Sequence, residues 1–165
     1  EIDPVLMELG RERHPQRPYQ DARVRRHVED GRAFLERSDR KYDLVLFALP
    51  DSLTLVSTSA NLRLESFLFT SEAFDDVRDH LTDDGLFVLY NFYREDWLPQ
   101  KIAGMLETSF GSPPIARLHG KAAATLAAGP AIRDLSGGSY FARCTSAPDH
   151  ACASTQPSRR ERPAR

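Results

Sequence analysis

Residues 42–49 read YDLVLFAL, and this continuous apolar run decides the fold class. Pro50 closes the run, which therefore has the length of a β-strand and is far too short to cross a bilayer. Apolar side chains at successive positions, rather than alternate ones, are typical of a strand covered on both faces. A second run of this kind, LFVLYNF, occupies residues 86–92. The two runs predict a largely parallel sheet covered by helices.

A capped amphipathic helix is predicted between these two strands. Residues 70–81 read TSEAFDDVRDHL, in which Thr70 can accept a hydrogen bond from the first helical turn. The Asp-Asp-Gly sequence at 83–85 is expected to end this helix. The apolar side chains that define its buried face are Phe74, Val77 and Leu81.

Further elements follow from caps, turn signals and apolar spacing. Asp3-Pro4 predicts a helix start, with Val5, Leu6 and Leu9 on its apolar face and Gly10 at its end. After Gly111 three short segments fit strands, although the Ala-rich middle one also fits a helix. The remaining predicted elements are helices over 31–38 and 96–110, a short strand over 23–28, and the three segments 115–120, 124–129 and 139–144. The alternation of helices and strands indicates an α/β domain.

Composition narrows the possible classes of protein. The chain has 165 residues and a formal charge of -2, which gives no electrostatic basis for a nucleic-acid partner. Cys144 and Cys152 match neither a metal-ligand spacing nor a disulfide framework, which favours a reducing, cytoplasmic compartment. Residues 146–165 are polar, rich in Pro, Ser, Ala and Arg, and predict a disordered tail after one domain over 1–145.

Ligands of open α/β sheets bind at the carboxyl ends of the strands. If Glu1 is the last residue of a strand, its carboxylate can accept both hydroxyls of a ribose. Asp30 follows the predicted strand over 23–28, and its carboxylate can read the edge of an adenine while Gly31 lets the backbone approach. Taken singly, Glu1 also fits a solvated terminal residue, and Asp30-Gly31 also fits a plain helix cap.

The order and spacing of four segments resemble the spermidine synthase family, the polyamine aminopropyltransferases. The segments are EIDPVLMELG (1–10), DARVRRHVEDGRAFL (21–35), KYDLVLFALPDS (41–52) and SFLFTSEAFDDVRDHLTDDGLFVLYN (66–91). The resemblance implies the three-layer Rossmann-like fold of class I S-adenosylmethionine-dependent methyltransferases, with a mostly parallel sheet and an antiparallel C-terminal edge. It also implies that the first strands and a glycine-rich loop lie upstream of Glu1, so we expect this chain to be an N-terminally truncated part of a larger protein.

The resemblance assigns roles to particular residues. It implies that Glu1 holds the ribose hydroxyls of S-adenosylmethionine or decarboxylated S-adenosylmethionine, that Ile2 packs on the adenine, and that Asp30 bonds its amino group beside Gly31. A small amine or polyamine would be the acceptor, in a pocket lined by Tyr90, Asn91 and Tyr93. The sequences of residues 47–52 and 90–95 are most similar to divergent, often membrane-fused members of the family. The resemblance is therefore compatible with a membrane-anchored parent protein, and also with a homodimer.

The candidate catalytic loop departs from the family pattern. The family carries D-[ST]-x-D-P after this strand, and its acids anchor the amine and accept its proton. Here the first acid is replaced by Ala48, whereas Asp51 matches the second. Asp51 is therefore the remaining candidate base, with Glu65 or Glu95 as helpers, although an aspartate after Pro50 also fits a turn.

Three functional hypotheses remain open at this point. The first is an aminopropyl- or methyltransferase, and the second is a catalytically inactive binding or regulatory module of the same fold, which Ala48 favours. The third is a nicotinamide dehydrogenase, since an acid after a second strand also reads a ribose in that class. An antiparallel strand pair after Gly111 would favour the methyltransferase fold, and a further parallel strand would favour the dehydrogenase.

Overall fold

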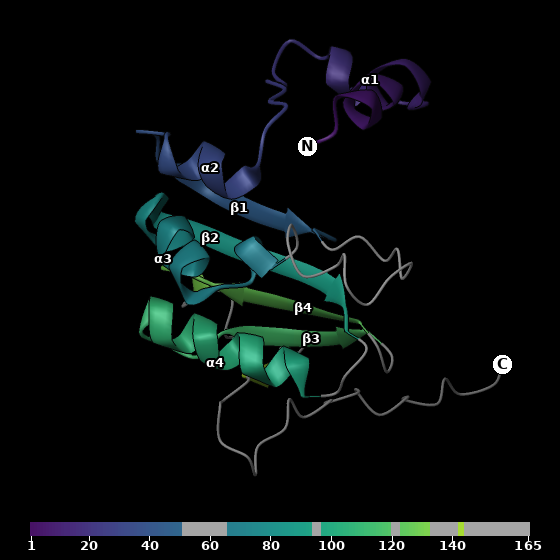
Figure 1. Ribbon diagram of the computed structural model, residues 1–165. Helices are drawn as coiled ribbons and strands as arrows, with labels where there is room; N and C mark the ends of the chain where they lie inside the picture. The colour runs from purple at the N-terminus through teal and green to yellow at the C-terminus, as the bar shows by residue number, and fades with distance from the viewer. Residues whose placement is uncertain (51–65, 94–96, 120–122, 133–141, 144–165) are drawn as a thin grey trace, which may run out of the picture. The chain divides into compact units, whose positions relative to one another are not determined.

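The computed structural model describes residues 1–50, 66–93, 97–119, 123–132 and 142–143 (Figure 1). The chain divides after Arg40 into two compact units, which are described separately. The first unit contains α1 (Pro4–Arg13), the 3-10 helix η1 (Pro18–Gln20) and α2 (Gly31–Glu36). The second contains β1 (Tyr42–Ala48), η2 (Ser66–Leu68), α3 (Ser71–Asp79), β2 (Leu81–Phe92), α4 (Leu98–Phe110), β3 (Ile115–His119), β4 (Ala123–Ala128) and β5 (Ala142–Arg143).

The sheet of the second unit has the strand order β1-β2-β4-β3-β5. β1 and β2 are parallel, and α3 connects them as a crossover helix. β4 runs antiparallel to both β2 and β3, and β5 runs antiparallel to β3. The predicted antiparallel C-terminal edge is confirmed, and the Ala-rich segment is a strand rather than a helix. This reversal contradicts the dehydrogenase hypothesis, which requires a further parallel strand.

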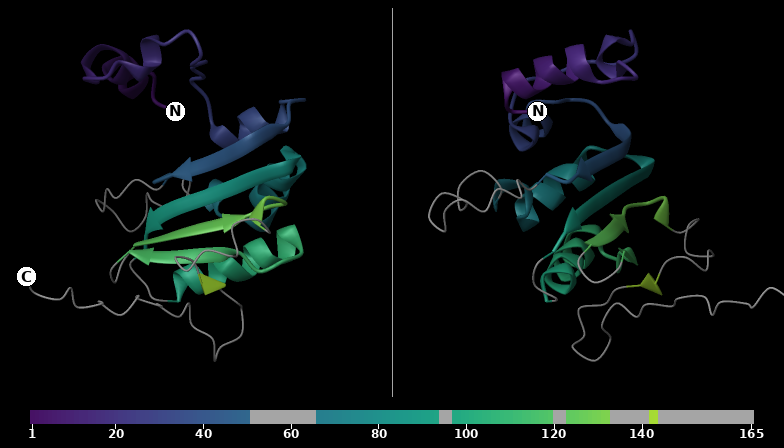
Figure 2. Two further views of the ribbon diagram at one scale, coloured as in Figure 1. Left: turned by 180° about the vertical axis from the view of Figure 1, so that it is seen from behind. Right: turned by 90° about the vertical axis from the view of Figure 1, so that its right-hand side faces the viewer.

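The core of the second unit lies between the sheet and the helices α3 and α4 (Figures 1 and 2). The side chains of Phe87 and Leu89 on β2 and Leu126 on β4 are fully buried on this covered face. Phe87 contacts three other rings: it stacks on Phe110 with 6.1 Å between centroids, lies edge-on to Phe47 at 5.1 Å and is tilted against Phe74 at 5.9 Å. Aromatic packing around Phe87 therefore joins β1, β2, α3 and α4.

α3 begins as predicted but ends earlier. Thr70 caps the helix by accepting a hydrogen bond from the Ala73 amide (3.1 Å). The helix ends at Asp79, and the predicted stop at residues 83–85 is wrong, because these residues lie within the span of β2. There the register with β1 is interrupted, and a Cβ at Gly85 would lie 2.9 Å from the Leu81 Cβ. The turn-forming sequence thus makes a compact bulge, which requires glycine, instead of a helix end.

The first unit corrects three sequence-based expectations. Asp3 caps α1 by accepting from the Val5 amide (2.7 Å), but Gly10 does not end the helix. Gly10 lies inside it because the Tyr19 ring packs there, and a Cβ would approach the Tyr19 Cε2 to 2.7 Å. The predicted apolar face of α1 (Val5, Leu6 and Leu9) is exposed. Residues 23–28 are not a strand: the Val24 amide donates to the Asp21 carbonyl in a turn, the His27 carbonyl accepts from the Glu1 nitrogen, and the described residues form no ladder with this segment.

The opposite face of the sheet is exposed over β1 and the end of β2, whereas Ile115, Ala127 and Ile132 form a buried cluster with Leu86 and Val88 elsewhere on it. Leu44 and Leu46 of β1 are 54% and 49% exposed, and the register places Leu46 on the same face as Tyr90 and Phe92 of β2, which are also exposed. We call these four side chains the open face; the left view of Figure 2 shows the ribbon of the sheet from the side away from α3 and α4. In the described part of the chain β1 pairs only with β2, so its other edge faces no described strand. No described helix has the length and hydropathy to span a membrane.

We expect an isolated polypeptide of residues 1–165 to self-associate through the open face and the β1 edge, since the first exposes apolar side chains and the second faces no described strand. The double variant Leu44→Lys/Leu46→Lys should shift the polypeptide toward monomer. Size-exclusion chromatography with light scattering over a concentration series measures this shift. Leu118→Lys is the matched control, because Leu118 is exposed but its register places it on the other face. A wild-type polypeptide that stays monomeric at all concentrations would contradict this expectation.

Candidate nucleoside site and acceptor side

The Glu1 main chain lies beside the extended segment that precedes α2. The Glu29 amide donates to the Glu1 carbonyl (3.0 Å), and the Glu1 nitrogen donates to the His27 carbonyl (3.4 Å). In neighbouring parallel strands, a residue on one strand bonds through its N–H and its C=O to two residues on the other strand that are two positions apart. Glu1 shows this pattern with residues 27 and 29. The pairing brings Glu1 next to Glu29 and so sets positions 1 and 30 at adjacent chain tips.

The two predicted nucleoside ligands each use one carboxylate oxygen locally. Glu1 accepts from the Asp3 amide through Oε1 (2.9 Å). Asp30 caps α2 by accepting from the Ala33 amide through Oδ1 (3.0 Å). Among the described residues, no partner is found for the second oxygen of either carboxylate, Glu1 Oε2 or Asp30 Oδ2. Both side chains therefore keep acceptor capacity for hydroxyl or amino donors of a ligand.

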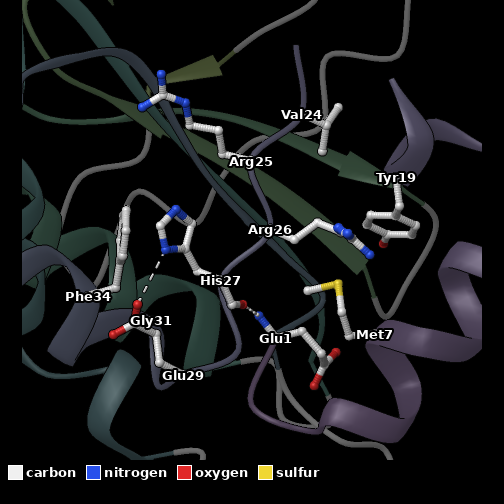
Figure 3. A pocket seen from close by; sticks show the side chains of 10 residues that line it. All are labelled: Glu1, Met7, Tyr19, Val24, Arg25, Arg26, His27, Glu29, Gly31 and Phe34. Atoms are coloured by element: carbon white, nitrogen blue, oxygen red, sulfur yellow. Dashed lines mark hydrogen bonds and ion pairs between the residues drawn. The ribbon is translucent and has the colours of Figure 1, made fainter. Parts of the chain in front are cut away.

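A pocket of about 260 Å³ opens beside this pairing, within the first unit (Figure 3). Two of the predicted residues, Glu1 and Gly31, line it, whereas Ile2 and Asp30 do not. Ile2 is exposed, and the Asp30 carboxylate is turned toward the start of α2. The remaining lining residues are Met7, Tyr19, Val24, Arg25, Arg26, His27, Glu29 and Phe34.

Sequence reasoning missed a network of charged side chains at this pocket. The Glu29 carboxylate binds the Arg37 guanidinium through Oε2 and faces His27 Nδ1 through Oε1 at 3.5 Å. The His27 ring is tilted against the Phe34 ring, with 4.6 Å between centroids. The only signal in the sequence is an acid directly before Asp30-Gly31, and nothing local marks its partner Arg37, eight positions away.

In the second unit, the carboxyl end of β1 lies beside β2. Ala48 pairs with Tyr90, and the Leu49 amide donates to the Tyr90 carbonyl (3.0 Å). Leu49 has φ 47°, a left-handed conformation that a branched side chain rarely adopts. Strained backbone of this kind gathers at functional sites, which agrees with a site after β1. The candidate base Asp51 and its helpers Glu65 and Glu95 lie outside the described residues.

The three predicted acceptor-pocket residues do not share one surface. Tyr90 is on the open face, while the next residue, Asn91, points to the covered face and is only 4% exposed. Asn91 Oδ1 accepts a hydrogen bond from the Phe92 amide (2.9 Å). Tyr93 is also 4% exposed, and its hydroxyl has no hydrogen-bond partner among the described residues. Asn91 and Tyr93 are thus buried, whereas Tyr90 is accessible from the other side of β2.

The buried hydroxyl of Tyr93 gives a measurable stability effect. Burial raises the pKa of Tyr93 well above its ordinary value, so the folded protein keeps the phenol proton at pH values where the unfolded chain releases it. Stability is therefore expected to fall as pH rises above about 10, the pKa of an unfolded tyrosine. Tyr93→Phe should remove this contribution, and at neutral pH it should raise the free energy of unfolding by about 1–3 kcal/mol because an unpaired buried hydroxyl is lost.

Denaturant unfolding followed at several pH values measures both effects. Tyr90→Phe is the matched control, since Tyr90 is exposed and its replacement should change neither the pH dependence nor the neutral-pH stability appreciably. A destabilised Tyr93→Phe variant would mean that the hydroxyl has a partner.

The chain has a fold of the Rossmann-like methyltransferase class. Human Methyltransferase-like protein 13, solved in complex with SAH, superposes with a TM-score of 0.57 at 19% identity, covering 93% of this chain and 62% of that one. Within this class, the family model of the spermine/spermidine synthase domain matches residues 1–111, and the chain belongs to that family.

Two named relatives match shorter parts of the chain. A polyamine aminopropyltransferase of Buchnera aphidicola subsp. Acyrthosiphon pisum (strain Tuc7) is 31% identical over 94 residues, covering 55% of this chain and 30% of the relative. Polyamine aminopropyltransferase 2 of Bacillus anthracis is 38% identical over 68 residues, covering 41% of this chain and 17% of the relative. The chain thus spans less than a third of the length of these relatives.

Proposed function

We propose that this chain forms part of a transferase that binds S-adenosylmethionine or its decarboxylated form and transfers a group to a small amine or polyamine. The observation that carries the proposal is the main-chain pairing of Glu1 with residues 27 and 29, which sets Glu1 and Asp30 at adjacent tips. Each carboxylate retains one oxygen without a described partner. The family membership and the names of the two relatives favour aminopropyl over methyl transfer.

The chemistry of the two carboxylates fits a nucleoside. A ribose presents two adjacent hydroxyl donors, and the Glu1 carboxylate offers acceptors to both at the edge of the pocket. Adenine presents an amino donor, for which Asp30 Oδ2 is the matching acceptor. Gly31, which also lines the pocket, leaves room for the ligand to approach the backbone.

The acceptor side of the reaction rests on the loop after β1. The donor supplies a carbon activated by a sulfonium, so that the amine nitrogen forms a bond to this carbon while the carbon–sulfur bond breaks and its electrons remain on sulfur. The nitrogen must give up a proton, and Asp51 is the carboxylate we assign to accept it. Ala48, at the end of β1, cannot take part, because its methyl group neither anchors a cationic amine nor accepts a proton.

A second candidate function is supported by the same residue. With Ala48 in place of the family's first acid, the domain would bind the nucleoside without turnover and serve as a binding or regulatory module. The two functions share the nucleoside site and differ only at the acceptor side. Turnover of a polyamine by the full-length protein would exclude the second function, and nucleoside binding without any turnover would exclude the first.

The nucleoside site is tested by calorimetric titration of the full-length protein with methylthioadenosine and S-adenosylhomocysteine. Glu1→Gln and Asp30→Asn should each weaken binding by about tenfold to a hundredfold, because each removes a charged acceptor from a hydrogen bond. Asp39→Asn, an exposed acid of the same unit, is the matched control and should leave the affinity unchanged.

The two roles can be separated with altered ligands. A 2′-deoxy analogue should bind wild type more weakly than methylthioadenosine does, and Glu1→Gln should bind both with similar affinity, because the variant has already lost the diol contact. Asp30→Asn should retain the preference for the ribose hydroxyl. Failure of the wild-type protein to bind either nucleoside would refute the proposed function.

A further inference from the structure

We propose that Glu29 is a positioning residue of the nucleoside site, which holds Glu1 and α2 in the geometry that ribose recognition requires. This inference rests on the proposed function above. Glu29 contacts both parts of the site: its amide donates to the Glu1 carbonyl (3.0 Å), and it directly precedes Asp30, the cap of α2. Any movement of Glu29 is therefore passed to both carboxylates.

The Glu29 side chain holds this main-chain position from two sides. Oε2 binds the guanidinium of Arg37, which is the C-cap residue of α2. Oε1 faces His27 Nδ1 at 3.5 Å, as Figure 3 shows. The pair with Arg37 spans the whole of α2, from the residue before its N-cap to the residue after its last turn. The side chain of Glu29 is 25% exposed and that of Arg37 is 64% exposed, so the pair lies at the surface and its role is to fix geometry rather than to add much stability.

Glu29 differs from the other two acids of the site in what its oxygens do. Both Glu29 oxygens already have cationic or potentially cationic partners within the protein. Glu1 and Asp30, by contrast, each keep an oxygen without a described partner. Under the proposed function, Glu1 and Asp30 each have a carboxylate oxygen left for the ligand, and Glu29 fixes the chain between them. Arg32, the other arginine on α2, pairs instead with Glu36 (3.2 Å) and so does not compete for Glu29.

The experiment compares affinities of the full-length protein for methylthioadenosine and its 2′-deoxy analogue. If Glu29 positions Glu1, Glu29→Ala should weaken methylthioadenosine binding by about threefold to tenfold and bring the affinity ratio of the two ligands toward one. Arg37→Met should cause a similar change. The double variant should bind methylthioadenosine as tightly as Glu29→Ala does, because both substitutions remove the same ion pair. Glu29→Gln, which can still donate and accept hydrogen bonds, should restore part of the ratio.

Glu36→Ala is the matched control, since it breaks an ion pair of the same helix that does not reach Glu1, and its ligand ratio should equal that of wild type. The proposal would be overturned if Glu29→Ala and Glu29→Gln weakened the binding of both ligands equally, which would leave their affinity ratio unchanged. Glu29 would then have a structural role only. These outcomes are distinct from failure of the proposed function itself, in which wild type would bind neither nucleoside and the inference would fall with it.

Discussion

The burial of one phenylalanine, Phe87, is the constraint on which the second unit depends. Its ring lies against rings from β1, α3 and α4 and is completely shielded from solvent. Because Phe87 pairs with Val45 on one side and Ala128 on the other, the same residue fixes a parallel and an antiparallel neighbour. The carboxyl ends of β1 and β2 therefore meet at one edge of the sheet, where an α/β fold carries its chemistry.

The first unit is held together mainly by hydrogen bonds and ion pairs, because few of its side chains are buried. Leu35 is the single side chain of the described residues 1–40 that is buried, so packing contributes little to the order of this region. Hydrogen bonds from Glu1 to residues 27 and 29, two helix caps and the ion pairs of Glu29 supply the specific contacts instead. Polar contacts between exposed groups are individually weak, and a bound ligand that bridges them would stabilise the arrangement by mass action.

Features that depend on local chemistry could be predicted from the sequence, and those that depend on distant partners could not. Asp3, Asp30 and Thr70 cap helices as expected, because capping involves residues only two or three positions apart. Turn-forming glycines were misread at two places, since the same residue type serves a helix end, a ring contact at Gly10 or a bulge at Gly85.

The candidate site divides in the same way. The sequence suggested that positions 1 and 30 are neighbours by the rule for strand ends, although residues 23–28 are not a strand, and the bonds of Glu1 to residues 27 and 29 are what links them. The partnership of Glu29 with Arg37 could not be predicted, because it requires α2 to be in place. Tyr90, Asn91 and Tyr93 were grouped because they lie at one strand end, but alternation along β2 sends Tyr90 and Asn91 to opposite faces.

One oxygen of Asp30 caps a helix, and the other, which has no partner among the described residues, is the one we propose for recognition. A substitution that keeps this helix start is consequently one of the residue types favoured as caps, which are Asp, Asn, Ser, Thr and Gly. Of these, Asn keeps the length and shape but replaces an acceptor by a donor, which would invert the preference from an amino group to a carbonyl on the base. Under the proposed function, a single substitution that leaves the start of the helix intact would therefore change which nucleobase is bound.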